Sequence, residues 1–498
     1  MAVVNTNYGR IEGYRVKGID VFKGIPYAKP PVGNLRFKPP VELDSWDGVL
    51  KANEYKSCPY QGYSQLEEWF GKLEPESEDC LNLNIWTPSC DDQKRPVMVW
   101  IHGGAFITGG GINPGYEGLN LSKRGDVVVV TINYRLGVLG FLYLPDKTVN
   151  VGLLDQVSAL RWIHKNIENF GGDPDNITIF GESAGGYSVI TLPVVPQAKG
   201  LFHRVIAQSA PYIDPEISEK TTRGFMRILK IKNGDLEELS QIPPEKIIDA
   251  QNKFMEKDPT NILAFRPIID GVVVPKHPLK AFREGECKDL DLIIGTNLDE
   301  AKLFTALEPS INNMIESGGE NALVMYMSTL KINPEQSKEI IKIYRAAREG
   351  KASVEPIELF NAILTDVMFR IPSIRLAEAQ SKYNPNTYSY IFTYKSPQFS
   401  GKLGSPHAIE IPFVFNTLDN PNWGNFVHNG ETEQEISQKI MNSWISFAKA
   451  GNPNHKNLPT WPGYSIDNRA TMIIGEECTV SNAPYDEERK AWTGLLDI

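Results

Sequence analysis

The stretch Ile177-Thr178-Ile179-Phe180-Gly181-Glu182-Ser183-Ala184-Gly185-Gly186 decides the fold. Its first four residues are apolar or β-branched and predict a buried strand, and the residues after Ser183 predict the start of a helix. The pattern Gly-x-Ser-x-Gly between them puts a serine on a sharp turn, where its hydroxyl stands clear of the backbone. The N-terminus of the following helix favours negative charge at the same place. Ser183 is therefore a candidate nucleophile at the end of a strand.

Similar runs recur along the chain and are separated by helical patterns. Strand-like runs lie at 96–101, 127–132, 205–207 and 292–294, and apolar side chains recur at helical spacing in 153–163 and 436–447. Strands that are buried on both faces and alternate with helices predict an α/β fold with a large, mostly parallel sheet flanked by helices.

Two more polar helical stretches, at about 212–290 and 305–375, interrupt this alternation. No linker rich in glycine and serine separates them from the rest of the chain. We expect a single catalytic domain over residues 1–498, in which these stretches are insertions that form a lid or one wall of a cleft.

A second motif, His102-Gly103-Gly104-Ala105-Phe106, follows the strand predicted at 96–101. A glycine-rich loop in this place lets several backbone N–H groups approach one point, which is what a tetrahedral oxyanion requires. An ordinary turn between a strand and a loop fits the same residues. The loop is not a phosphate-binding loop, because no Gly-Lys-Ser/Thr follows it.

A nucleophilic serine needs a base, and the base needs an orienting acid. In α/β-hydrolases the chain order is serine, then acid, then histidine. Asp299 and Glu300 follow the strand at 292–294, and this order leaves three histidines. His428 and His455 lie among turn residues and are expected in solvated loops, which favours His407. Order along the chain does not choose between Asp299 and Glu300.

Charge and composition exclude several other classes of function. The formal net charge is −10, whereas binding to nucleic acid or anionic lipid needs a basic face. No apolar run approaches the ~18 residues of a membrane-spanning helix, and the first residues do not resemble a signal peptide, so we expect a cytoplasmic location. The five cysteines form no Cys-x-x-Cys pair, so we expect reduced thiols and no metal.

Taken together, these motifs resemble the type B carboxylesterase/lipase family, and most of all its bacterial para-nitrobenzyl esterase branch. The resemblance runs nearly from end to end. Besides the serine motif and the loop at 102–106, it rests on segments that fall in family order: 22–28, 30–33, 77–84, 134–137, 155–156, 295–300 and 406–413.

The resemblance implies an α/β-hydrolase fold and a set of site residues. It assigns Ser183 as the nucleophile, Glu300 as the acid and His407 as the base. The backbone N–H groups of Gly104, Ala105 and Ala184 become the donors of the oxyanion hole, with Ala105 where many relatives carry a third glycine.

Four further residues are assigned more loosely. Glu182 and Ser209 are expected to support the site, each with a plain structural role as the alternative. Cys58 and Cys80 stand where secreted relatives of the family form a disulfide.

The expected activity is hydrolysis of small carboxylic esters with short to medium acyl chains, through an acyl-enzyme and without a cofactor. The alternatives are a lipase that acts on longer-chain lipids and a non-catalytic adhesion protein of the same family. A monomer or weak homo-oligomer is expected.

Overall fold

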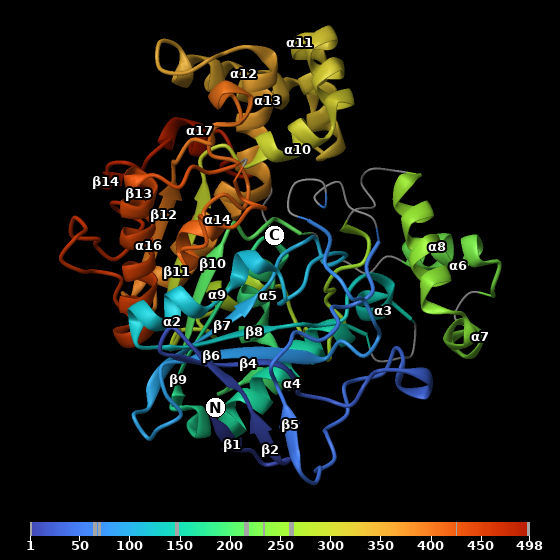
Figure 1. Ribbon diagram of the computed structural model, residues 1–498. Coiled ribbons are helices and arrows are strands. Elements are labelled where there is room, and N and C mark those ends of the chain that lie inside the picture. Colours follow the sequence, from blue (N-terminus) through green and yellow to red (C-terminus); the bar gives the residue numbers. More distant parts are fainter. Residues whose placement is uncertain are drawn as a thin grey trace.

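One large sheet runs through the molecule and carries the other elements (Figure 1). The computed structural model describes residues 2–62, 67, 71–144, 149–213, 219–232, 235–257, 263–424 and 426–495. The sheet has eleven strands in the order β14-β13-β12-β11-β10-β9-β7-β8-β6-β4-β3, and a small sheet has the order β1-β2-β5.

In the large sheet, the strands from β13 to β8 in the order given above are parallel to one another. The strands outside this run, at the two margins of the sheet, pair antiparallel. Parallel strands present their carboxyl ends at one edge, which is where open α/β sheets bind ligands. The strand bounds are β1 Val3–Asn5, β2 Arg10–Glu12, β3 Tyr14–Val16, β4 Ile19–Pro26, β5 Val49–Lys51, β6 Asn82–Thr87, β7 Arg95–Ile101, β8 Val128–Ile132, β9 Gly172–Glu182, β10 Arg204–Gln208, β11 Asp291–Asn297, β12 Thr387–Phe392, β13 Ala470–Ile474 and β14 Thr479–Asn482.

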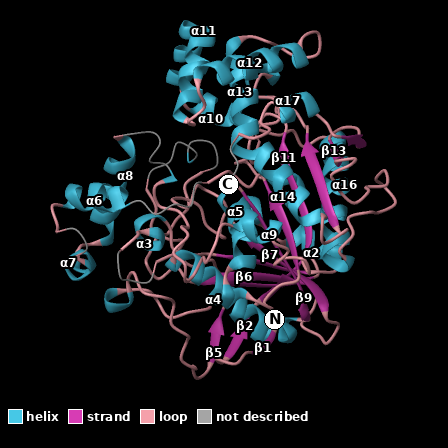
Figure 2. Cartoon of the chain, turned by 180° about the vertical axis from the view of Figure 1, so that it is seen from behind, coloured by secondary structure: helices cyan, strands magenta, loops and turns pink. Residues whose placement is uncertain are grey.

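Helices cover both faces of the large sheet (Figures 1 and 2). Successive side chains of β7 point to opposite faces, so that Val97 and Val99 join one apolar core while Met98 and Trp100 join the other. The first core includes α4 (Val151–Asn166), α5 (Ala184–Thr191), α9 (Pro278–Arg283) and α14 (Ile371–Ser381). The second includes α2 (Leu119–Gly125), α15 (Ile411–Phe415) and α16 (Glu431–Ala450).

Two helical groups stand away from the sheet in Figure 1. One holds α6 (Glu219–Leu229), α7 (Leu236–Gln241) and α8 (Pro244–Glu256), close to α3 (Gly137–Phe141). The other holds α10 (Ala301–Leu307), α11 (Pro309–Thr329), α12 (Pro334–Arg348) and α13 (Pro356–Thr365), followed by the π-helix η7 (Asp366–Arg370). The second group has an apolar core of its own, which Trp492 joins just beyond α17 (Asp486–Lys490).

The sequence predicted the fold class correctly, and a large, mostly parallel sheet flanked by helices is present. The five predicted strands appear as β7 to β11, and the helical pattern at 436–447 lies in α16, whose last turn closes on Gly451 at a φ of 69°. Both polar stretches are helical, although α10 begins at Ala301, slightly before the expected start of the second insertion. The assignment of one catalytic domain with two insertions stays a prediction.

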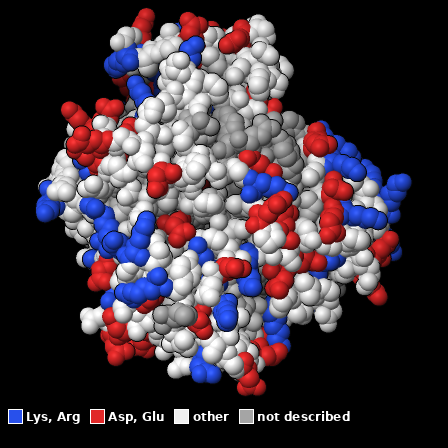
Figure 3. Space-filling view, viewed as in Figure 1, with Lys and Arg blue, Asp and Glu red and all other residues white. Residues whose placement is uncertain are grey.

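The surface bears charges of both signs. Lysine and arginine are interspersed with aspartate and glutamate over the face drawn in Figure 3. Within the described ranges, no helix is both long enough and apolar enough to cross a membrane.

Candidate active site

Ser183 lies on the turn between β9 and α5, as the sequence predicted. Its backbone has φ 56° and ψ −120°, an unusual conformation for a residue with a side chain, and its N–H donates to the carbonyl of Gln208 at 3.0 Å. A side chain at position 185 would collide with the carbonyl oxygen of Ile101 on β7. The glycine there lets α5 pack directly on the sheet, and this packing holds the serine at the edge.

Glu300 and His407 form a direct contact. The Nδ1 atom of His407 lies 2.6 Å from Oε2 of Glu300, and both side chains are buried. The other carboxylate oxygen, Oε1, accepts a hydrogen bond from the N–H of Asn297 at 2.7 Å and another from Oγ of Ser209 at 2.5 Å. The carboxylate is therefore fixed in place by strand ends β10 and β11 while it faces the imidazole.

The neighbouring Asp299 has a different environment. Its Oδ2 accepts the N–H of Ser405 at 2.9 Å, and its Oδ1 lies 3.6 Å from Nζ of Lys302. Of the two acids that chain order left open, Glu300 contacts the histidine, whereas Asp299 contacts Ser405 and Lys302.

The second ring nitrogen of His407 faces a second carboxylate. Nε2 lies 3.0 Å from Oε1 of Glu182, the residue before Ser183. Across the described residues, no hydrogen bond joins His407 to the hydroxyl of Ser183. Two aromatic rings flank the imidazole, with centroid distances of 4.8 Å to Phe369 and 5.2 Å to Phe304.

The loop after β7 brings backbone donors to the serine. Gly104 and Ala105 both have positive φ, 107° and 53°, which turns the chain back on itself. A Cβ at Gly103 would lie 2.7 Å from the carbonyl oxygen of Glu182, so the loop passes directly over the serine turn. No acceptor within the described part of the chain pairs with the N–H of Gly104, Ala105 or Ala184.

Glu182 and Glu300 contact His407, and a third buried glutamate, Glu410, lies near both carboxylates, so burial and charge shift the pKa of Glu182, His407 and Glu410. Burial raises the pKa of Glu182, and His407 opposes this rise. Burial alone would lower the pKa of His407, but the carboxylates of Glu182 and Glu300 outweigh it, and the pKa rises well above its usual value. Burial also raises the pKa of Glu410 to about 7, helped by the other two glutamates.

Glu410, three residues after His407, is held by two side-chain amides. Its oxygens accept hydrogen bonds from Nε2 of Gln208 at 3.0 Å and from Nδ2 of Asn297 at 2.6 Å. Because Asn297 also donates to the carbonyl of Pro406 at 2.9 Å, this network ties the histidine loop to β11.

The predicted site residues Glu182, Ser183, Gly104, Ala105 and His407 line one cavity. It measures about 860 Å³ including its open mouth. Its apolar wall includes Leu303 and Phe304 of α10, Ile411 and Trp423, and none of the described lining residues comes from 212–290.

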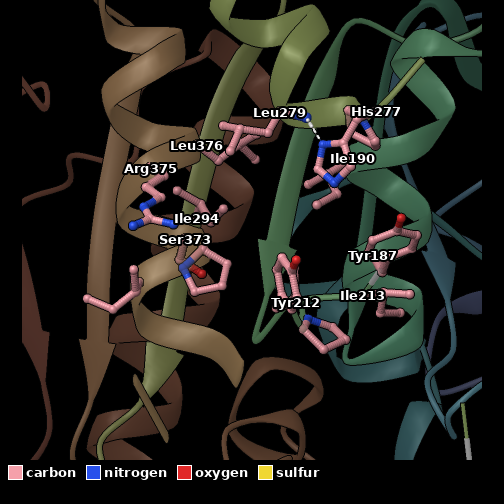
Figure 4. Close-up of a pocket in the computed structure, with 15 residues that line it drawn as sticks. Tyr187, Ile190, Tyr212, Ile213, His277, Leu279, Ile294, Ser373, Arg375 and Leu376 are labelled. Carbon is pink, nitrogen blue, oxygen red and sulfur yellow. Dashed lines mark hydrogen bonds between the residues drawn. The ribbon is translucent and has the colours of Figure 1, made fainter. Parts of the chain in front are cut away.

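A second cavity, about 570 Å³, lies between α5 and α14 and shares no described lining residue with the first (Figure 4). It contains His277, one of the histidines after Ser183 in the chain. Its Nδ1 accepts the N–H of Leu279 at 3.1 Å, so it caps α9 and lies away from the serine.

The other predicted alternatives also lie elsewhere. The N–H of His428 donates to the hydroxyl of Tyr394 at 3.2 Å. His455 lies in a loop, as expected, and its ring is half-buried against α16 with Nε2 3.1 Å from the carbonyl of Lys439. Cys58 and Cys80 are buried free thiols. No cluster suited to a metal ion occurs in the described portions of the chain.

Sequence reasoning missed four residues that shape the site: Gln208, Asn297, Phe304 and Phe369. Gln208 and Asn297 are the last residues of β10 and β11, shortly before Ser209 and Glu300, and this position is a signal that could have found them. The two phenylalanines occupy helical positions at which the sequence indicates only ordinary apolar core residues.

A parallel sheet with a serine raised at a strand–helix turn, a His–Glu pair and a loop of free backbone donors defines an α/β-hydrolase. The model of the carboxylesterase family matches residues 1–492, and the chain belongs to that family. It is an enzyme that hydrolyses carboxylic esters.

Similar proteins support the same assignment. The para-nitrobenzyl esterase of Bacillus subtilis is 37% identical over 498 residues, which cover 98% of each chain. The phenmedipham hydrolase of Pseudarthrobacter oxydans is 35% identical over 493 residues, 95% of each chain. The crystal structure of a Geobacillus stearothermophilus carboxylesterase superposes with a TM-score of 0.87 at 39% identity, covering 98% of this chain and 99% of the other.

Proposed function

We propose that the protein cleaves esters of short to medium acyl chain length through Ser183, His407 and Glu300, with an acyl-enzyme as intermediate. The observation that carries this proposal is the 2.6 Å contact between Nδ1 of His407 and Oε2 of Glu300, beside the cavity that Ser183 lines. A carboxylate on Nδ1 fixes the tautomer that leaves Nε2 free to accept a proton.

In the first half-reaction, Oγ of Ser183 attacks the ester carbonyl carbon and its proton passes to Nε2 of His407. Nε2 first turns from Glu182 toward Oγ, a small change of the kind that substrate binding produces in such sites. The imidazolium gives the proton to the departing alcohol. Water then attacks the acyl group by the same route, which releases the acid and restores the serine.

The negative charge that develops on the carbonyl oxygen needs donors that are already in place. The unpaired N–H groups of Gly104, Ala105 and Ala184 supply them. Loss of one such donor costs roughly 3 kcal/mol of transition-state stabilisation in comparable enzymes. The N-terminus of α5, which begins at Ala184, adds a favourable field.

The size of the cavity supports a small-molecule substrate. About 860 Å³, part of it open mouth, lies within the range of sites for small ligands. Small-molecule esters are thus the proposed substrates. The cytoplasmic location and the monomeric or weakly associated state expected from the sequence stay predictions.

A panel of nitrophenyl esters of graded acyl length tests this proposal by comparison of kcat/KM. We expect kcat/KM to fall away beyond about eight carbons, since the cavity is of the size that suits small ligands. An increase for long chains, with a jump in rate once the ester forms droplets, would instead identify a lipase. Complete lack of turnover would favour the non-catalytic adhesion alternative.

A further inference from the structure

A buried ionic cluster lies behind the catalytic histidine, outside the residues assigned so far. It joins Asp366 and Arg370 of η7 to Glu488 of α17, and all three side chains are buried. Nη2 of Arg370 donates to Oδ2 of Asp366 at 2.8 Å and to Oε2 of Glu488 at 2.9 Å. The guanidinium thus bridges two carboxylates from distant parts of the chain.

Side chains from the helical insertion and the C-terminal region complete the cluster. Nε of Arg348, at the end of α12, donates to Oε1 of Glu488 at 2.8 Å. The hydroxyl of Tyr344, also on α12, donates to Asp366 and accepts from Nε1 of Trp492. The cluster therefore fixes η7 against two other elements.

The π-helix and the residue before it make three contacts, two with the surroundings of Glu300 and His407 and one with Tyr212 of the neighbouring cavity. Thr365, just before η7, accepts the N–H of Ala301, the residue after Glu300, at 3.1 Å. The carbonyl of Met368 accepts the N–H of Tyr212 at 2.5 Å. The ring of Phe369 lies 4.8 Å from the imidazole of His407.

Arg370 directly follows Phe369, so the position of the guanidinium and that of the ring are coupled through one peptide unit. A π-helix carries one more residue per turn than an α-helix, and such segments occur frequently at functional sites. Here the wider turn directs Arg370 into the cluster while Phe369 faces the histidine.

We propose that Arg370 is a positioning residue for the reaction, which, held by Asp366 and Glu488, keeps Phe369 packed against the imidazole of His407. The proposal rests on the proposed function, because it assigns the role through His407. A ring held on one side restricts how far the imidazole can tilt, and the reach of Nε2 toward Ser183 depends on that tilt. Misplacement of a reacting group by 1 Å costs up to about 100-fold in rate.

The test compares two variants that act on the two ends of this connection. Glu488→Gln keeps the shape and one hydrogen bond of the cluster but removes a charge, and Phe369→Leu keeps the cluster but removes the ring. We expect kcat to fall about tenfold in each, with KM within about twofold, as misplacement of a reacting group predicts. The double variant is expected to fall no further than either single one, because both act through the same contact.

A matched control separates positioning from loss of stability. Arg36 and Glu78 form a largely buried ion pair, with contacts of 2.5 and 2.6 Å, and Arg36 also donates to the carbonyls of Ser240 and Ile242 rather than to any site residue. Glu78→Gln is expected to lower the unfolding temperature while leaving kcat unchanged. Where Glu488→Gln does not fold, Arg348→Gln perturbs the same carboxylate from the rim of the cluster.

Two further readouts report on the histidine itself. The rate at which a fluorophosphonate labels Ser183 is expected to fall with kcat in Glu488→Gln, and the low-field proton resonance of His407 Nδ1–H is expected to shift. Failure to label Ser183 in the wild type would defeat the proposed function. Normal labelling, kcat and resonance in folded Glu488→Gln, or additive losses in the double variant, would defeat the positioning role alone.

Discussion

The Nε2 atom of His407 lies 3.0 Å from Oε1 of Glu182, so the imidazole stands between two carboxylates, with Glu300 on its other nitrogen at 2.6 Å. Both carboxylates favour the charged form of the ring, and the pKa of His407 rises well above its usual value despite burial. A general base must be neutral to accept a proton. We therefore expect Glu182 to stabilise the imidazolium of the transition state and to influence the pH at which the resting enzyme becomes active.

Glu182→Gln tests this dual effect. Removing the charge lowers the pKa of His407, so the neutral base is present at lower pH. We expect the acidic limb of kcat/KM against pH to move by about one unit toward lower pH. The plateau rate is expected to fall, because the imidazolium loses an anionic partner. An acidic limb at the wild-type pH would show that Glu182 does not act on His407 in the working enzyme.

The contacts of His407 with the carboxylates of Glu182 and Glu300 also affect the stability of the fold. Because the pKa of His407 is raised in the folded state, its contribution to the free energy of unfolding is fully present below the unfolded pKa, near 6.5, and is lost as pH rises through the folded value. Urea titrations of wild type and His407→Gln are expected to differ most in mildly acidic solution and to converge at alkaline pH. A difference that grows with pH would contradict the assigned direction.

Glu300→Gln and Asp299→Asn form a matched pair of adjacent, isosteric changes. Only Glu300 contacts His407, whereas Asp299 accepts the N–H of Ser405. We expect kcat to fall about 10³- to 10⁴-fold in Glu300→Gln, the size of effect that follows loss of the orienting acid, and to change little in Asp299→Asn. The reverse result would transfer the acid role to Asp299.

Ala105→Gly probes the oxyanion loop. Its backbone N–H is retained, and its positive φ of 53° suits glycine better than alanine, so we expect full activity on small esters. Removal of the methyl widens the space beside Ser183, and kcat/KM for esters of bulky alcohols is expected to rise. Unchanged selectivity between bulky and small alcohols would show that this methyl does not limit the cavity.

The serine turn and the sheet follow from the sequence because both depend on local patterns. Buried β-branched runs separated by helices define the layers of the fold. The glycine at 185 allows α5 to pack closely on β7. Order along the chain identified both Asp299 and Glu300 as candidates for the orienting acid but did not choose between them. Adjacent residues share every local signal, and only the fold determines which side chain turns toward His407.

Other parts of the site depend on tertiary contacts and could not be predicted from the sequence. Phe304 and Phe369 come from different helices, yet their rings stack on each other at 6.1 Å and both contact the imidazole of His407. A π-helix such as η7 has no simple residue pattern, so its effect on Phe369 could not be predicted. His455 lies in a loop, as its turn residues predicted, but its partial burial against α16 is a tertiary contact that those residues do not signal.

Acid quenching during turnover of a nitrophenyl ester, followed by peptide mapping, tests the central claim most directly. The account predicts one acyl group per chain, carried by the peptide that contains Ser183, with a matching burst of nitrophenol. Ser183→Ala is expected to show neither the adduct nor hydrolysis while keeping the wild-type unfolding temperature. An acyl group on another residue, or a hydrolysis rate in a clean preparation of Ser183→Ala close to that of wild type, would contradict it.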